Sequence, residues 1–560
     1  MQSFGHIIDG KETESYSGMT SRSVDPYTRT PWAETAVGDR TDADRAVQAA
    51  RRAFDSGPWP RMGYGERGRI LHQLADLIEH NGHELGMADT LDMGKPITQS
   101  QGNDVPRSAS NFRFFADHAR LSTAETLPMD SGHHTYTRFE PAGVVAAIAP
   151  WNFPLMLETW KIAPALAWGN TVVLKPAEDT PASATILARL ALEAGMPPGV
   201  LNVVHGYGPD SAGQALTENP AVDRITFTGE SGTGRIIAAA GARSLTPVSL
   251  ELGGKGANVV FDDADLDTAV EWSIKAIFTN TGQICLAGSR IYVQRAVHDA
   301  FLRRFTAAAE ALLIGDPKQA STVIGPLASQ EHHQKVRGYL DSVEAEGGTI
   351  VTGGPGDGWT VRPTVVTGLG HDSRHAREEI FGPLVVVIPF GTEEEAVGLV
   401  NDSRYGLNAM LFTENLHRAH RVSASVRAGT VWVNCFFIRD LRAPFGGVGD
   451  SGIGREGGNF SREFFTEPKA VVMQIRPEEQ PSGISGPAPT AGPDSDGAHH
   501  YHHLPTHRPE GDRLRGAAGP SDGAVVEAAP REEGPVGELP GALHSSDPEA
   551  IHPGASRDES

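Results

Sequence analysis

Short apolar runs alternate with amphipathic segments along most of the chain. Between about residues 38 and 119 the pattern is mainly helical, because ADRAVQAARRAF and RGRILHQLADLIEHNGHEL repeat apolar residues at intervals of three and four. Later runs, such as GVVAAIAP, NTVVLKP, LNVVHG and RITFTG, are apolar on both faces and are followed by helical segments. Strands buried on both faces belong to a parallel sheet covered by helices. We therefore expect a doubly wound α/β domain.

The same alternation of strand and helix patterns begins again after Gly254. The run ANVVF predicts a strand, and the following DLDTAVEWSIKAIFTN places Leu266, Val270, Ile274 and Ile277 on one helical face. The run RIYVQ and the segment HDAFLRRFTAAAEALL then predict the next strand and helix. A second α/β domain is expected to follow the first.

The character of the sequence changes after Ile475. Residues 477–560 are rich in Pro, Gly, Ser, Asp and His and have almost no aliphatic periodicity. Such a segment buries too little apolar surface to offset its ordering entropy, so we predict that it is disordered. Its HHYHH cluster is interpreted as part of a solvated linker, and no metal site is predicted.

The formal net charge of -22 and the two cysteines narrow the possible partners and compartment. An acidic surface repels nucleic acid and anionic membranes, so neither is an expected partner. The start of the chain has no signal-peptide pattern, and Pro150 and Pro154 interrupt the most apolar stretch. We expect a soluble protein of the reducing cytoplasm.

Cys285 lies in the stretch FTNTGQICLAGSR, between a predicted helix and a predicted strand. A free cysteine is most often a small buried hydrophobe, and Cys435 in an apolar run is interpreted in this way. Around Cys285, however, Gly282 and Gly288 allow the backbone to approach a substrate closely. Backbone amides in such a loop stabilise a thiolate or an oxyanion, so Cys285 is a candidate nucleophile.

Two polar residues in apolar surroundings are candidates for the groups that a thiol nucleophile needs. Glu251 ends an apolar strand in LELGGK, where desolvation raises a carboxyl pKa towards the range of a general base; a strand-end salt bridge is the alternative. Asn152 lies in the stiff turn APWNFP, where its amide either points into a site or satisfies a backbone carbonyl. The residues themselves leave both alternatives open.

Two further segments suggest a dinucleotide. Lys175 and Glu178 follow a predicted strand, at the end where open α/β sheets bind ligands. An acidic group there accepts the hydroxyls of an adenosine ribose and repels a 2'-phosphate. Gly229 and Gly234 in FTGESGTG lie between a strand and a helix with a spacing that is only a weak dinucleotide signal. A Walker loop is excluded because Arg235 follows Gly234.

Taken together, seven motifs resemble the aldehyde dehydrogenase superfamily. They are APWNFP, KPAEDTP, FTGESGTG, LELGGK, NTGQIC, EEIFGP and PFGG with SGIGREGG, in register from about Ile8 to Ile475. The resemblance implies a Rossmann-like cofactor domain, an α/β catalytic domain and a small β oligomerisation arm. It places the NAD-binding domain at residues 1–122 and 142–253, the catalytic domain at 254–455, and the arm at 123–141 and 456–476.

The resemblance also implies a role for each matching residue. Cys285 would be the nucleophile, Asn152 with the Cys285 backbone N–H the oxyanion hole, and Glu251 the base that activates water. Glu467 in FFTEPK matches a second acidic residue of the family, assigned to proton handling or structure. The implied NAD contacts are Pro150, Trp151, Lys175, Glu178, Gly229, Glu230, Gly234, Glu379 and Phe381. Family members are commonly homo-dimers or homo-tetramers.

The segments DVPRSASNFRFFAD and VNCFFIRDLRAPFGG are similar to the branch that acts on muconic semialdehydes. Arg107 and Arg439 match positions where this branch binds the substrate carboxylate. The alternatives are a surface helix arginine for Arg107 and a salt bridge with Asp440 or a neighbour for Arg439. The competing functions are a betaine or other amino-aldehyde dehydrogenase, a CoA-acylating variant, and a catalytically silent binding or structural protein of the same fold.

Overall fold

The computed structural model describes residues 1–127, 129 and 132–475. The predicted disordered tail and its histidine cluster lie outside the described residues. Within these ranges, none of the helices combines the length and the apolar character that a membrane crossing requires.

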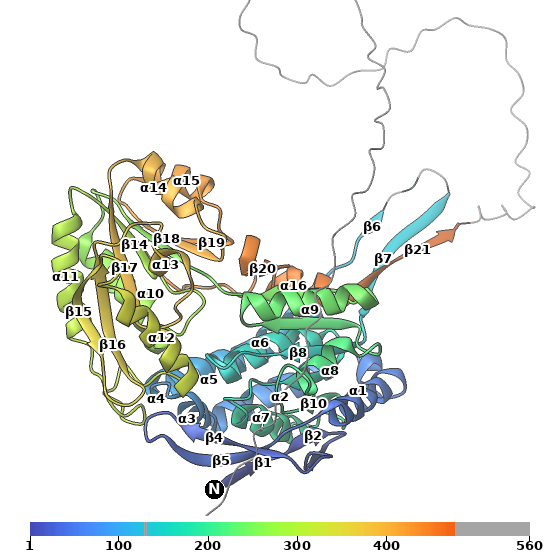
Figure 1. The fold of residues 1–560 in the computed structure, drawn as a ribbon. Coiled ribbons are helices and arrows are strands. Elements are labelled where there is room, and N and C mark those ends of the chain that lie inside the picture. Colours follow the sequence, from blue (N-terminus) through green and yellow to red (C-terminus); the bar gives the residue numbers. More distant parts are fainter. Residues whose placement is uncertain (128, 130–131, 476–560) are drawn as a thin grey trace, which may run out of the picture. The chain divides into compact units, whose positions relative to one another are not determined.

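The first half of the chain forms an eight-stranded sheet in the order β20-β12-β11-β8-β9-β10-β2-β3 (Figure 1). Its strands are β2 (His6–Ile8), β3 (Lys11–Thr13), β8 (Val144–Ile148), β9 (Thr171–Lys175), β10 (Leu201–Val203), β11 (Arg224–Thr228), β12 (Val248–Glu251) and β20 (Gly452–Ile453). The five strands from β12 to β10 are parallel, and β20, β2 and β3 extend the sheet in antiparallel pairing. β20 comes from residues that the sequence places in the catalytic range.

Alternate residues of β8 show that both faces of this sheet are buried. Val145 and Ala147 belong to a core shared with the helices α2, α5, α6 and α7, whereas Val144 and Ala146 belong to a core shared with α1, α8 and α9. These helices are α1 (Arg40–Asp55), α2 (Tyr64–His80), α5 (Val105–Leu121), α6 (Pro154–Ala167), α7 (Ala182–Glu193), α8 (Ala212–Glu218) and α9 (Ser231–Ser244). The predicted doubly wound arrangement is therefore present.

The mainly helical region predicted before the sheet is also present, and it contains one irregular turn. After α3 (Gly82–Met93) come the short α4 (Ile97–Gln99) and a π-helical turn, η2 (Ser100–Asp104), which runs directly into α5. π-helical turns often occur at functional sites.

The second half of the chain forms a seven-stranded sheet in the order β15-β16-β17-β14-β13-β18-β19, parallel except for the β15–β16 pair. Its strands are β13 (Ala257–Val260), β14 (Arg290–Gln294), β15 (Thr349–Pro355), β16 (Val361–Thr367), β17 (Leu384–Phe390), β18 (Asn408–Phe412) and β19 (Thr430–Val433). The helices packed with it are α10 (Leu266–Phe278), α11 (His298–Glu310), α12 (Gln330–Ser342), α13 (Arg374–Arg377), α14 (Glu393–Asn401) and α15 (Leu416–Ser425). In α10 the predicted face packs inward, with Val270 and Ile277 buried and Leu266 and Ile274 partly buried.

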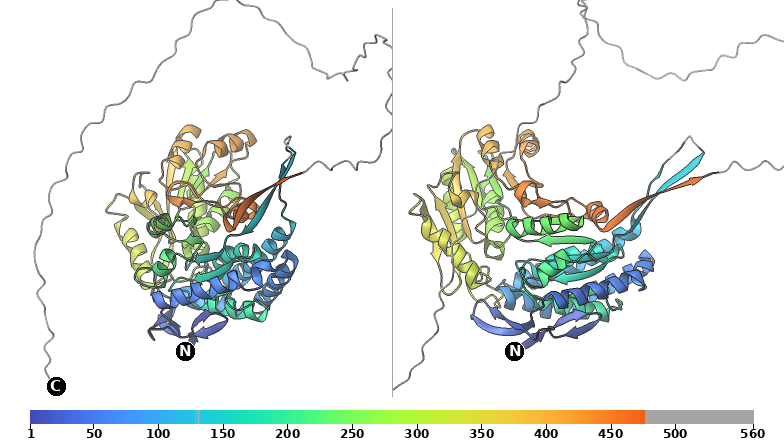
Figure 2. Two further views of the ribbon diagram at one scale, coloured as in Figure 1. Left: turned by 90° about the vertical axis from the view of Figure 1, so that its right-hand side faces the viewer. Right: turned by 45° about the vertical axis from the view of Figure 1, so that its right-hand side comes forward.

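Two smaller sheets complete the described chain. β1 (Gln2–Phe4), β5 (Thr30–Ala36) and β4 (Thr20–Asp25) pair near the N-terminus. A long ribbon of β6 (Thr126–Leu127), β7 (His133–Pro141) and β21 (Thr466–Gln474) projects from the body of the molecule, with α16 (Gly458–Phe465) at its base (Figure 2). This ribbon contains the strands predicted for the arm, and the predicted α/β class with two main sheets is confirmed.

Candidate active site

Cys285 is held by a loop with unusual backbone geometry. After α10, Asn280, Thr281 and Gly282 follow one another with φ of 51°, 57° and 74°. A Cβ at Gly282 would lie 2.3 Å from the carbonyl oxygen of Gly382, so only glycine fits there. This left-handed turn places the half-buried Cys285 at a point where two hollows meet.

Asn152 is buried and attached to the cysteine loop through both its side chain and its backbone. Its Nδ2 donates to the Gln283 carbonyl at 3.0 Å, and its own carbonyl accepts from Asn280 Nδ2 at 2.8 Å. Since the first bond uses only one of the two amide hydrogens, the other is free for a ligand. Both sequence-based alternatives are thus realised: the amide satisfies a carbonyl and also lines the cavity that contains Cys285.

Glu251 ends β12 and is 3% exposed, and neither of its carboxyl oxygens has a hydrogen-bond partner among the described residues. Burial and the neighbouring Glu456 carboxylate raise its pKa well above the ordinary value. The sequence-based alternative, a strand-end salt bridge, is wrong because Lys161 pairs with Glu456 instead, at 3.2 Å. An unpaired, desolvated carboxyl is suited to accept a proton.

Glu456 lines the hollow beside Cys285 and Glu251, and the sequence does not single it out. It lies in the motif SGIGREGG, and its buried carboxylate accepts from Trp160 Nε1 at 2.5 Å and from Thr226 Oγ1 at 3.3 Å. The motif was part of the family resemblance, but its glutamate had no local feature that marked it as part of the site.

The thiol of Cys285 is protonated in this environment. Burial raises its pKa to about 12, and the Glu379 and Glu251 carboxylates add to the rise, while Arg439 opposes it. Conversion to the thiolate therefore requires a proton acceptor or an added positive charge near the sulfur.

The first cavity, of about 420 Å³, opens on one side of Cys285. The predicted residues that line it are Pro150, Trp151, Asn152, Glu178, Gly229, Glu230, Cys285, Glu379 and Phe381. Lys175 and Gly234 are not among the described residues that line it. The Lys175 ammonium donates to the Pro176 carbonyl and lies 3.6 Å from Glu178, while Gly234 packs in the first turn of α9 against Leu252.

Glu379 and Phe381 form one end of this cavity. Glu379 accepts from the Gly254 backbone N–H at 2.8 Å, and Phe381 has a left-handed backbone with φ of 62°. His332, which the sequence reasoning did not identify, donates from Nε2 to the Phe381 carbonyl at 2.7 Å and packs against Trp151. Burial lowers the pKa of His332 to about 4, so its ring is neutral.

The first cavity suits a dinucleotide. The N-terminus of α9 borders it, and the residue before this helix, Glu230, makes no side-chain cap, so the backbone N–H groups there are available to a pyrophosphate. Glu178 presents a partly exposed carboxylate that can accept the hydroxyls of a ribose.

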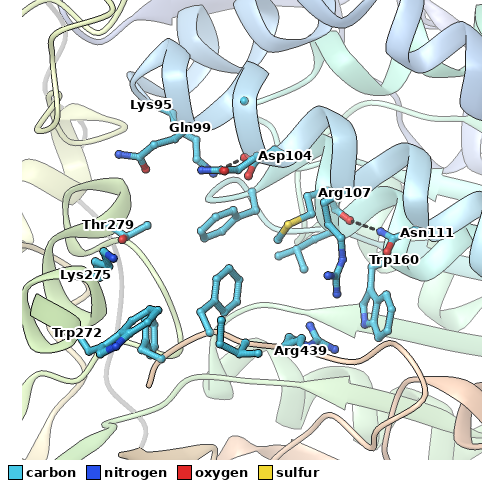
Figure 3. Close-up of a pocket in the computed structure, with 18 residues that line it drawn as sticks. Lys95, Gln99, Asp104, Arg107, Asn111, Trp160, Trp272, Lys275, Thr279 and Arg439 are labelled. Carbon is cyan, nitrogen blue, oxygen red and sulfur yellow. Dashed lines mark hydrogen bonds and ion pairs between the residues drawn. The ribbon is translucent and has the colours of Figure 1, made fainter. Parts of the chain in front are cut away.

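The second cavity, of about 440 Å³, lies between α5, α6 and the loop after β19 (Figure 3). Its lining shares Phe153, Met156, Leu157, Trp160, Phe437 and Arg439 with a small hollow beside Cys285 and Glu251. The second cavity therefore leads to the sulfur from the side opposite the first cavity.

Arg107 and Arg439 approach each other in the second cavity (Figure 3). Among the described residues, neither has an ion pair with a carboxylate, and Arg439 Nη2 is buried without a hydrogen-bond partner. The Arg439 guanidinium lies over the rings of Trp160 and Phe445, at 4.7 and 3.9 Å from their centroids. Burial and the nearby Arg107 lower the pKa of Arg439 to about 10, which leaves it charged at neutral pH.

Both alternatives considered for these arginines are wrong. Arg107 is not a surface helix residue, because it is partly buried in the wall of the second cavity. Arg439 does not pair with Asp440, because Asp440 pairs with Arg442 at 2.6 Å.

Glu467 is not brought together with the other predicted residues. It lies on β21, is largely exposed, and forms an ion pair with Arg224. It lines neither cavity nor the hollow at Cys285.

Comparison with known proteins agrees with this geometry. The profile of the aldehyde dehydrogenase family matches residues 13–471, and the chain belongs to this family. It is 47% identical over 488 residues to a 2-hydroxymuconic semialdehyde dehydrogenase of Pseudomonas sp. (strain CF600), covering 85% of this chain and 100% of the relative. It is 44% identical over 490 residues to a 2-aminomuconic 6-semialdehyde dehydrogenase of Pseudomonas sp., covering 85% and 99%.

The fold of this chain is also similar to solved structures of aldehyde dehydrogenases. The fold is similar to that of a putative aldehyde dehydrogenase from Burkholderia cenocepacia, with a TM-score of 0.83 and 44% identity over 85% of this chain and 98% of that one. It is equally similar to an indole-3-acetaldehyde dehydrogenase in complex with NAD+, with a TM-score of 0.83 and 39% identity over 85% and 97% of the chains.

Proposed function

We propose that this aldehyde dehydrogenase uses NAD to oxidise a carboxylated, unsaturated semialdehyde of the muconic type to the corresponding acid. We infer the substrate class from one pair of arginines. Arg107 and Arg439 meet in the second cavity, and neither has a carboxylate partner among the described residues. A guanidinium binds a carboxylate through two parallel hydrogen bonds, so an anionic substrate supplies the partner that the fold does not.

The catalytic residues define the chemistry at the other end of the substrate. The Cys285 thiolate adds to the aldehyde carbon, and the carbonyl oxygen becomes an oxyanion that accepts from the Asn152 amide and the Cys285 backbone N–H. NAD held by the residues of the first cavity would supply the acceptor for the hydride that this carbon loses. A thioester then joins the substrate carbon to Cys285. Glu251 removes a proton from water, the resulting hydroxide attacks the thioester, and the acid leaves as the sulfur regains its electron pair.

The competing functions fit the cavities less well. A betaine or amino-aldehyde carries a positive charge, which the two unpaired arginines repel. A CoA-acylating enzyme has no use for a water-activating base, yet Glu251 lies beside Cys285 in a hollow. A catalytically silent protein has no need for the nucleophile, base and oxyanion donor together.

We further propose that the protein acts in the cytoplasm as a homo-dimer or homo-tetramer. The support is the projecting ribbon of β7 and β21, which carries exposed apolar side chains. The ion pair of Glu467 with Arg224 gives Glu467 a structural role at the base of this arm. The division into an NAD-binding domain at residues 1–122 and 142–253, a catalytic domain at 254–455 and the arm remains part of this proposal.

The test compares NADH formation from a carboxylated semialdehyde and from a neutral aldehyde of similar length. We expect Cys285→Ala to abolish NADH formation with both. Loss of a charged hydrogen bond costs about 1.5–3 kcal/mol, so Arg107→Ala and Arg439→Ala should each raise KM for the carboxylated substrate roughly 10- to 100-fold and leave KM for the neutral one nearly unchanged. Arg442→Ala, which removes an exposed arginine paired with Asp440, is the matched control. Equal increases for both substrates would exclude the carboxylate clamp.

A further inference from the structure

A buried ion pair lies in the wall of the second cavity, next to the turn that carries Asn152. Lys95 follows the C-terminal end of α3, and Asp104 is the last residue of the π-helical turn η2. Their exposed fractions are 1% and 2%, and the Lys95 ammonium is paired with the Asp104 carboxylate (Figure 3). Burial of two charges is costly, so a buried pair is weak evidence for a role in stability alone.

The Lys95 ammonium also contacts the Asn152 turn directly. Nζ lies 3.3 Å from the centroid of the Phe153 ring and 3.5 Å from the Asn152 carbonyl oxygen. The same carbonyl accepts from Asn280 Nδ2 at 2.8 Å. A cation is attracted both to the face of an aromatic ring and to a carbonyl dipole. The turn is therefore held on one side by Lys95 and on the other by the cysteine loop.

The segment that carries Lys95 is itself fixed against the second half of the chain. The Ile97 backbone N–H donates to the Pro317 carbonyl at 2.8 Å, and Gln99 Oε1 accepts from the Asn280 backbone N–H at 2.9 Å. Gly94, with φ of 76°, leaves space for Pro326, whose Cγ would lie 2.6 Å from an added Cβ. The segment of Lys95 thus connects the turn that carries Asn152 with residues around Pro317 and Pro326, which are distant in the sequence.

We propose that Lys95, held in place by Asp104, is a positioning residue for Asn152, and that it fixes the oxyanion donor relative to the sulfur of Cys285. This inference rests on the proposed function. Although Lys95 lies in the wall of the second cavity, its ammonium is already bonded to Asp104 and to the Asn152 turn. It acts through Asn152 and not on the substrate carboxylate.

The experiment is a double-mutant cycle between Lys95 and Asn152 in the full-length protein, with NADH formation from the carboxylated and the neutral aldehyde as the readout. A displacement of about 1 Å in an active site can cost about 100-fold in rate, so we expect Lys95→Met to lower kcat roughly 10- to 100-fold with both substrates. In the Asn152→Ala background, the same substitution should cost less than about threefold, because the group through which it acts is gone.

Two further variants separate positioning from charge and stability. Lys95→Met alone leaves a buried carboxylate unpaired, so Lys95→Met/Asp104→Asn removes both charges, and thermal unfolding checks that it is folded. We expect kcat of this double variant to be as low as that of Lys95→Met, because the variant restores charge balance but not the contact with the Asn152 turn. Lys318→Met breaks a partly buried pair with Asp25, at 3.1 Å, outside the lining of both cavities, and should leave kcat unchanged.

Three results would overturn the inference while the proposed function stands. The first is that Lys95→Met lowers kcat by the same factor in the wild-type and the Asn152→Ala backgrounds. The others are that Lys95→Met/Asp104→Asn recovers kcat, or that Lys95→Met raises KM for the carboxylated substrate alone. Absence of Cys285-dependent NADH formation in the unaltered protein would overturn the proposed function, and this inference with it.

Discussion

At the scale of single residues, the Cys285 thiol lies between two carboxylates. Burial raises its pKa most, Glu379 and Glu251 raise it further, and Arg439 and the Cys285 backbone N–H oppose the rise. The pKa of Glu379 is itself raised to about 7 by burial. Under the proposed function, an oxidised nicotinamide ring in the first cavity would bring a positive charge towards the sulfur and favour the thiolate. Cys285 would then be reactive mainly when NAD is bound.

This environment predicts the pH dependence of alkylation without NAD. Below the pKa of a thiol, the thiolate fraction rises tenfold per pH unit, so with a pKa of about 12 the rate at Cys285 should rise continuously from about pH 7 to about pH 10. Mass spectrometry of the iodoacetamide-labelled peptide measures the rate, and Cys435→Ser removes the second thiol. A plateau below about pH 9 would show that burial and the carboxylates do not raise the pKa of Cys285.

The sequence singles out most of the groups that the proposed function uses, since Cys285, Glu251 and Asn152 stand out against small or apolar neighbours. It does not predict Glu456 or Lys95, because their significance arises from contacts between distant segments. Glu456 is 295 positions from Lys161, and Lys95 is 57 positions from Asn152. No periodicity or local motif records such contacts.

At the scale of elements, the arm is the part of the described chain that is least covered by its own fold. β7 and β21 pair over nine residues each, and Val472 and Met473 are 58% and 47% exposed. A long, narrow ribbon with apolar side chains in water is marginally stable and offers a surface to another chain.

We expect Val472→Lys/Met473→Lys to shift the protein towards a smaller assembly, because two charges on the arm oppose burial against a second copy. Size-exclusion chromatography with light scattering gives the mass. Val351→Lys, at a partly exposed position on β15, is the control and should leave the mass unchanged. An unaltered mass for the arm variant would show that assembly uses another surface.

Elements with strong periodicity, such as α10 and β8, were predictable from the sequence. The turn at Asn280 and Thr281 was not, because neither residue type signals two successive left-handed conformations. The short strands β2, β3 and β20 at the two ends of the first sheet are not predictable either, since their two or three residues carry no pattern, and β2 and β20 join this sheet through partners far away in the chain.

At the scale of the whole molecule, the family match ends within β21. The 2-hydroxymuconic semialdehyde dehydrogenase of strain CF600 is covered over its entire length by 85% of this chain. The described residues that line the two cavities all lie before residue 476.

We predict that a chain ending at Ile475 keeps kcat and both KM values within about twofold and its melting temperature within about 2 °C, because every described residue that lines the two cavities precedes position 476. Steady-state kinetics and thermal unfolding of the two forms provide the comparison. A tenfold fall in kcat/KM would assign the tail a role in catalysis.

The first and second cavities share no lining residue, and they meet only at the hollow that contains the sulfur. Under the proposed function, the cofactor and the aldehyde therefore enter from different cavities. Neither would need to leave before the other exchanges with bulk solution.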